Sequence, residues 1–179
     1  MRLTLRLTPC HGLNGSMEPM RKLAGEGGAM AHGLALVGLP ELELHGMSEA
    51  VREETEIPGA VARLLERLKG QGAIESREVH LCYDGTSDRT LIRVTAAVGE
   101  PMTGTRPVTL PGAGTAAVIR FGERPVNTGD AWLMVDTALR GKGLTAVGPY
   151  RQTIHGDGSV TLAVPVSSGT PRTEAEAGA

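Results

Sequence analysis

The sequence predicts an α+β fold in which one strand-helix-strand-strand module is used twice. Leu39-Pro40 recurs as Leu110-Pro111, and the Gly-x-Gly pair at 70 and 72 recurs at 141 and 143, always 71 residues apart. In each half, an amphipathic helix pattern and two strand-like runs follow a first strand-like run. A constant separation needs no insertion between the markers. We therefore interpret the chain as a tandem duplication, with repeat one at 34–99 and repeat two at 105–166.

A strand is expected before each helix. Leu42 and Leu44 alternate with Glu41 and Glu43, which is the period of a half-buried strand. In the second half, residues 116–121 are rich in Val, Ile and Ala.

One helix of about three turns is predicted in each half. The first has apolar residues at i, i+3, i+4 and i+7, namely Val61, Leu64, Leu65 and Leu68. Pro58 suits its first turn, where the missing N–H is not needed, and Gly70 and Gly72 supply the end. The second helix has cap candidates at Asn127, Thr128 and Asp130, and its stripe of Trp132, Val135 and Leu139 aligns with Val61, Leu64 and Leu68.

Two more strands are predicted after each helix. In the first half they are 78–83 and 90–98, with a turn at Asp84-Gly85. In the second half they are 150–155 and 160–166, with a turn at Gly156-Asp157-Gly158. Two such units side by side form an antiparallel sheet with two main helices and leave a groove at the pseudo-twofold seam.

The two ends of the chain differ in composition from this middle part. Residues 1–31 are broken by glycines and are expected to be a flexible leader, which leaves Met1, Met17, Met20 and Met30 open as translation starts. Residues 167–179 have no apolar anchor and are expected to be a disordered tail. We find neither a secretory signal nor the roughly 18 consecutive apolar residues of a membrane span, and we expect a cytoplasmic protein with its domain at 32–166.

Composition argues against several functions. The 179 residues carry a formal charge of −2, so no overall basic field draws the protein to nucleic acid, and a short Gly-rich leader does not suit a helix-turn-helix. Cys10 and Cys82 are read as free thiols. The five histidines lack zinc-ligand spacing, and P-loop, dinucleotide and Gly-x-Ser-x-Gly motifs are missing. The sequence therefore predicts neither metal nor cofactor, and no direct DNA binding.

The second repeat resembles a known family. Its marks are Leu110-Pro111, Asp130-Ala131-Trp132, the run from Gly143 to Tyr150, and the closing Val164-Pro165-Val166. In order and spacing they are similar to the GyrI-like small-molecule-binding domain, which is also the effector-binding half of multidrug-sensing MerR-type and AraC-type regulators. The resemblance covers about residues 34–166. It implies a stand-alone tandem module with a groove for flat, hydrophobic and often cationic compounds.

The sequence departs from that family in two ways. Many members have an acidic residue in the last strand, where this chain has Thr161, with Thr95 at the equivalent place in repeat one. The resemblance then implies a preference for neutral ligands, with both threonines at the site. Aromatic residues are only 2% of the chain, so the candidates for stacking on a ligand are few: Trp132, Tyr150, Tyr83 and Phe121. Either the ligand is smaller and more aliphatic, or only a few rings stack on it. An alternative for Trp132 is that its side chain packs in the hydrophobic core and does not contact a ligand.

Three residues are candidates for catalysis. His80 and Tyr83 are three positions apart in one predicted strand, so only one of them faces the groove. Glu54 precedes the first helix, where it favours the helix dipole or is solvated, or else acts as a base at the groove mouth.

We therefore expect a binder of a hydrophobic, planar drug or natural product, for resistance or sensing. The alternative is a metal-independent hydrolase that adds water to a strained electrophilic ring, with a groove Glu, His or Tyr positioning the water. A third interpretation is a protein–protein module that antagonises a target such as gyrase through Arg63, Arg67 and Lys69. The oligomeric state stays open.

Overall fold

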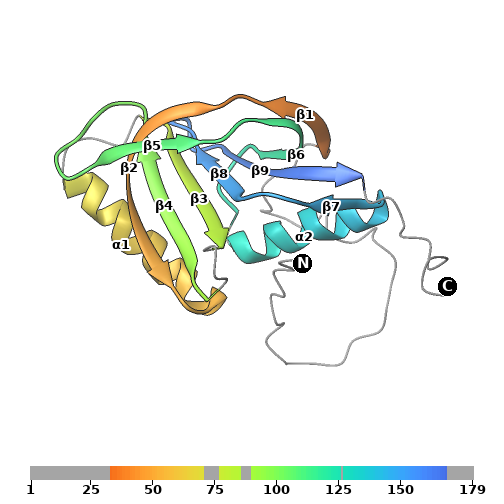
Figure 1. The fold of residues 1–179 in the computed structure, drawn as a ribbon, viewed down its shortest axis with the longest axis horizontal. Coiled ribbons are helices and arrows are strands. Elements are labelled where there is room, and N and C mark those ends of the chain that lie inside the picture. Colours follow the sequence, from red (N-terminus) through yellow and green to blue (C-terminus); the bar gives the residue numbers. More distant parts are fainter. Residues whose placement is uncertain (1–32, 71–76, 86–89, 126, 169–179) are drawn as a thin grey trace, which may run out of the picture.

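The computed structural model describes residues 33–70, 77–85, 90–125 and 127–168. The predicted leader at 1–31, with Cys10, and the chain after Ser168 lie outside them. The first half contains β1 (Ala35–Leu39), β2 (Leu42–Val51), the 3-10 turn η1 (Glu54–Glu56), α1 (Ile57–Gly70), β3 (Val79–Gly85) and β4 (Ile92–Val98). The second half contains β5 (Arg106–Leu110), β6 (Ala113–Phe121), α2 (Thr128–Gly141), β7 (Leu144–Ala146), β8 (Tyr150–Ile154) and β9 (Val160–Ser168) (Figure 1).

The predicted α+β class and the duplication are confirmed. Within the described ranges, the structure has a nine-stranded antiparallel sheet and two helices, and α1 and α2 begin and end 71 residues apart. The same separation relates β1 to β5 and the first residues of β2 and β6, and of β3 and β8. The repeat differs from prediction by one additional strand at its start, since β1 and β5 precede the strands that were expected.

The Leu-Pro motif marks the place where each repeat crosses into the other. β1 pairs with β6 of the second half, and β5 pairs with β2 of the first half. Pro40 and Pro111 lie in the short links after β1 and β5, where a residue without an N–H does not interrupt a ladder. A Cβ at Gly112 would approach Glu41 N and Leu39 O to 3.1 Å, so the crossing chains are closely packed there.

The seam between the repeats runs along β3 and β8. These strands pair antiparallel, and the register places Leu81 opposite Gln152. The same two residues are equivalent at the 71-residue separation. The pseudo-twofold axis therefore passes through this pair, with Tyr83 opposite Tyr150 on one side of it.

Both helices cover one face of the sheet, and their predicted stripes form its core (Figure 1). Leu64 and Leu68 of α1 and Val135 and Leu139 of α2 are at most 2% exposed. α1 packs on β2 and β4, whereas α2 packs on β6 and β7. Because each helix packs mainly on strands of its own half other than the central pair, β3 and β8 are left as a floor between the helices.

Of the two predicted turns, one is absent and one is present. Asp84 and Gly85 are not a turn; they extend β3 and pair with Arg93 and Ile92 of β4. Cross-strand pairing overrides the local turn signal there. The turn at 156–158 is confirmed by the hydrogen bond from Gly158 N to His155 O, and Gly158 has a φ of +82°, which suits glycine. β9 continues to Ser168 by pairing with β7.

The opposite face of the sheet has a smaller apolar cluster of Leu44, Cys82, Ala97 and Leu110. The Cys82 thiol is free, and burial, with a smaller effect of Asp84, raises its pKa to about 11. Neither α1 nor α2 is long and apolar enough to cross a membrane.

Candidate functional site: a pocket on the pseudo-twofold seam

A cavity of about 500 Å³ lies between α1 and α2, where the duplication predicts a groove. Its walls use equivalent positions of the two helices, namely Ile57 and Thr128, Pro58 and Gly129, Val61 and Trp132, and Leu65 and Asp136. Its floor is made by Tyr83 of β3 and by Tyr150 and Gln152 of β8. The pocket is thus a product of the duplication, with one helix of each repeat on either side.

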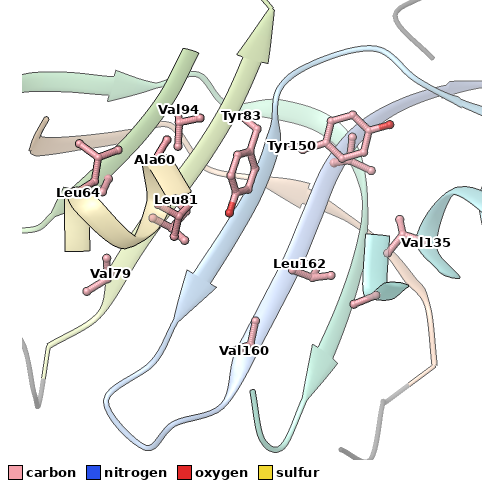
Figure 2. Close-up of a cluster of buried hydrophobic side chains, with 14 of the residues drawn as sticks. Ala60, Leu64, Val79, Leu81, Tyr83, Val94, Val135, Tyr150, Val160 and Leu162 are labelled. Atoms are coloured by element: carbon pink, nitrogen blue, oxygen red, sulfur yellow. The ribbon is translucent and has the colours of Figure 1, made fainter. Parts of the chain in front are cut away.

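Two aromatic side chains form the wall on the side of α2. The Trp132 and Tyr150 rings meet edge to face, with centroids 5.0 Å apart and an angle of 86° between their planes. Tyr150 is buried, while Trp132 is partly exposed to the pocket. Figure 2 shows Tyr150 on the side of Val135 of α2, and Tyr83 on the side of Ala60 and Leu64 of α1.

The aromatic wall is joined to a pair of carboxyl groups. The Tyr150 hydroxyl donates to Asp136 Oδ1 at 3.1 Å. Burial raises the pKa of Asp136, although the Tyr150 hydrogen bond opposes this. Burial also raises the pKa of Glu54, and the nearby negative charge of Asp136 adds to it. Burial and the two carboxylates raise the pKa of Tyr150, so this phenol stays protonated and acts as a donor.

The short turn η1 before α1 carries two glutamates with different surroundings, Glu54 and Glu56. The Glu56 carboxylate accepts hydrogen bonds from the backbone N–H groups of Arg52 at 2.8 Å and Glu53 at 3.1 Å. Glu56 therefore satisfies the backbone donors ahead of the helix. Glu54, two residues earlier in the same turn, is half-buried and lines the pocket.

The floor has a polar pair in an apolar setting. The Tyr83 hydroxyl donates to Gln152 Oε1 at 2.9 Å, and Gln152 is only 1% exposed. Burial raises the pKa of Tyr83, so this phenol is also a donor rather than a base.

Asp136 and Gln152 are pocket residues that the sequence analysis does not single out. A signal was present, because the 71-residue separation aligns Asp136 with Leu65 and Gln152 with Leu81. In both cases a polar residue replaces an apolar one at an equivalent, inward-facing position. This difference between the repeats could have identified Asp136 and Gln152.

Four predicted site residues lie outside this pocket. Phe121 is 3% exposed within the core. Thr95, Thr161 and His80 alternate with inward-facing residues of their strands and so face the other side of the sheet. Thr95 hydrogen-bonds Ser48 at 2.8 Å, and Thr161 hydrogen-bonds His155 Nε2 at 2.8 Å. The threonines and Phe121 are therefore not lining residues, whereas Trp132, Tyr150, Tyr83 and Glu54 are.

His80 belongs to a separate polar cluster on that other face. Its Nε2 lies 3.2 Å from Glu78 Oε1, and its Nδ1 lies 3.3 Å from the Thr153 hydroxyl. Burial lowers the pKa of His80, against the influence of Glu78. Of the pair His80 and Tyr83, Tyr83 is the one that faces the pocket, as the spacing of three requires for one of them.

Charged groups at the pocket rim are of both signs. Glu66 and Lys69 of α1 and Arg124 line it as exposed residues. Lys69 forms an exposed ion pair with Glu66 at 3.4 Å, and Arg63, on the same helix, pairs with Glu49 at 3.0 Å. Among the described residues, no group of three or more His, Cys, Asp and Glu side chains could hold a metal ion.

Comparison with known proteins supports the fold. No family model and no curated protein matches the sequence. An integron cassette protein from the mobile metagenome of Vibrio cholerae superposes with a TM-score of 0.62 at 14% identity, over 76% of this chain and 97% of that chain. SAV2435 bound to tetraphenylphosphonium gives 0.55 at 15% identity, over 76% and 94%. The EcmrR C-terminal domain gives 0.53 at 10% identity, over 76% and 98%.

At these identities the likeness is one of fold. It agrees with the resemblance of the sequence to the GyrI-like small-molecule-binding domain.

Proposed function

We propose that this chain binds a hydrophobic, planar small molecule, a drug or natural product, in the pocket between α1 and α2, for resistance or sensing. The observation that carries the proposal is the pocket itself: about 500 Å³ on the seam, with the apolar side of α1 facing the Trp132–Tyr150 pair. Small-molecule sites commonly have this size and few polar groups. The fold is shared with SAV2435, which is bound to tetraphenylphosphonium.

Trp132 is the single tryptophan of the chain and a lining residue, so its fluorescence reports on the pocket directly. We would titrate the protein with neutral and cationic planar compounds. At least one compound is expected to change the emission saturably. Val147→Ala, at an exposed residue outside the pocket, should bind equally well. If no compound gives a saturable change, by fluorescence or by calorimetry, the proposal is wrong.

A second candidate is a cofactor-free hydrolase, and the observation that favours it is the position of Glu54. Its half-buried carboxylate, with a pKa raised by burial and by Asp136, lines the same pocket. A raised pKa makes a carboxylate a stronger base. In such a reaction Glu54 takes a proton from water, and the water oxygen bonds to a strained ring carbon. The ring bond breaks, and its electron pair receives the proton.

Mass spectrometry separates these two functions. A hydrolase converts a cyclopropane or epoxide probe into a product heavier by one water. Glu54→Gln should then stop turnover and still bind the probe, while Glu123→Gln, at an exposed residue outside the pocket lining, should keep both. If such probes bind without any change in mass, the hydrolase function is wrong and only the binding function is supported.

A further inference from the structure

Gln152, which lines the floor of the pocket, carries a buried hydrogen-bond donor without a partner among the described residues. Gln152 Oε1 accepts from Tyr83, but Gln152 Nε2 is buried and makes no hydrogen bond in the described part of the chain. Of the buried side-chain nitrogen and oxygen atoms described, Arg151 Nε is the other such case. Arg151 is on the opposite face, where its guanidinium donates to Pro111 O. Gln152 alone of the two lines the pocket.

Packing does not require an amide at this place. The equivalent residue of the first repeat is Leu81, which is fully buried and lies directly across the seam from Gln152. The same sheet position therefore accepts leucine, a side chain of similar volume. A buried donor that is left unpaired is costly, and buried polar groups are normally hydrogen-bonded. A partner from outside the chain would account for Gln152.

The Tyr83 hydroxyl hydrogen-bonds the oxygen end of the Gln152 amide. This hydroxyl is buried and donates its proton to Oε1. Burial raises the pKa of Tyr83 and so keeps this proton in place. The Nε2 group, which can only donate, is therefore the end left for a ligand.

The carboxylates that line the pocket come from elements other than β8. Asp136 is bound to Tyr150 and lies on α2, Glu54 is in the turn before α1, and the lining residues include no carboxylate beside Gln152 on β8. An amide N–H attracts an uncharged oxygen acceptor and does not balance a positive charge. The floor therefore favours a ligand with an uncharged oxygen acceptor, whereas a buried acid at this place would favour a cation.

We propose, on the basis of the binding function above, that Gln152 recognises a carbonyl oxygen at the buried end of a planar aromatic ligand. The chemical class is that of aromatic ketones, quinones and lactones. Gln152 donates to the oxygen, Tyr83 holds the amide in orientation, and the ring system lies between α1 and the Trp132–Tyr150 pair. Gln152 is thus a specificity-determining residue.

Matched probes test this directly. Calorimetry would compare 9-fluorenone with fluorene, which differ by the carbonyl, and include ethidium as a planar cation. The wild-type protein should bind fluorenone ~tenfold or more tightly than fluorene. Gln152→Leu, which copies Leu81, should bind both equally and unfold in urea at no lower concentration. Gln152→Glu should lose the carbonyl preference and gain affinity for ethidium.

The outcomes separate this proposal from the binding function. If fluorene and fluorenone bind the wild-type protein equally, or if Gln152→Leu keeps the preference, the role of Gln152 is wrong while pocket binding stands. A strongly destabilised Gln152→Leu would mean that the amide is structural, and this too would overturn it. If no planar compound of any kind binds, the binding function fails and the proposal fails with it.

Discussion

The two repeats of this chain share one scaffold but differ at the pocket. Positions that face the core are apolar in both: Leu64 corresponds to Val135, and Leu68 to Leu139. Positions that face the pocket diverge. On the first repeat they are Val61 and Leu65, with Leu81 at the seam, and on the second they are Trp132, Asp136 and Gln152.

The difference shows which part of each repeat is constrained by folding. A core position can accept only another apolar side chain of similar volume, because buried polar groups need partners. A position at the edge of the cavity tolerates a ring or a carboxylate, as at Trp132 and Asp136. The buried amide of Gln152 is accommodated by its hydrogen bond from Tyr83. The duplication supplies the cavity, and the second repeat supplies most of its specific chemistry.

The largest effect is expected where the repeats agree. Leu64→Ala removes a fully buried side chain and should lower the free energy of unfolding by about 2–5 kcal/mol. Val135→Ala, at the equivalent position, should cost less by about the value of one buried methylene, ~0.8 kcal/mol. Urea unfolding measures both. Each variant should unfold in a single transition, because residues of both helices belong to one core cluster.

Two separate transitions, or a Val135→Ala variant as stable as the wild type, would contradict the common core. Leu133→Ala serves as the control, since Leu133 is on the same helix but 45% exposed. It should change stability by less than about 0.5 kcal/mol.

The next effect is expected where the repeats differ. Trp132→Val gives the second helix the residue that the first has at this place, and it removes the ring that meets Tyr150 at 5.0 Å. Affinity for a planar ligand should fall by about tenfold or more, equivalent to about 1.4 kcal/mol. Calorimetry measures this, since the fluorescent residue is lost. Val61→Ala, the matched change on the α1 side, should weaken binding less.

Equal losses for the two variants would mean that the ligand does not distinguish the walls. No loss for Trp132→Val would place the ligand away from the aromatic pair and contradict its proposed position.

The fold could be predicted from the sequence more completely than the pocket residues could. The helices were predictable because their apolar stripes have helical period and recur at a fixed separation. β1 was missed because four of its five residues are exposed and show no alternation, and Asp84-Gly85 was misread because the pairing partner of a strand is not a local property. Thr161 alternates with Val160 and Leu162, so its outward direction was already present in the sequence.

The site residues divide in the same way. Trp132, Tyr150, Tyr83 and Glu54 could be named from their type and place in the repeat, whereas Phe121, named on the same grounds, lies in the core. Asp136 and Gln152 were detectable in the sequence only as polar residues aligned with Leu65 and Leu81. Their hydrogen bonds with Tyr150 and Tyr83 join different elements and so required the structure.

The smallest expected effect is on the pH dependence of stability, through the carboxyl groups of Glu54 and Asp136. The pKa of Glu54 is raised in the folded protein by burial and by Asp136, so the unfolded chain releases this proton more readily. Stability from this group is therefore greatest at low pH. It declines as pH rises from about 4, where unfolded carboxyl groups titrate, through the raised folded pKa. Glu54→Gln removes the decline and should be slightly more stable than the wild type at pH 7.

Unfolding measured at several pH values tests this, because titrations elsewhere in the chain cancel between variant and wild type. The gain should vanish once both carboxyl groups are protonated, and it should shrink in Asp136→Asn, where the second charge is gone. A Glu54→Gln variant that is less stable at pH 7 would have the wrong sign, and would show that the ionised carboxylate is held by a favourable partner rather than opposed by Asp136.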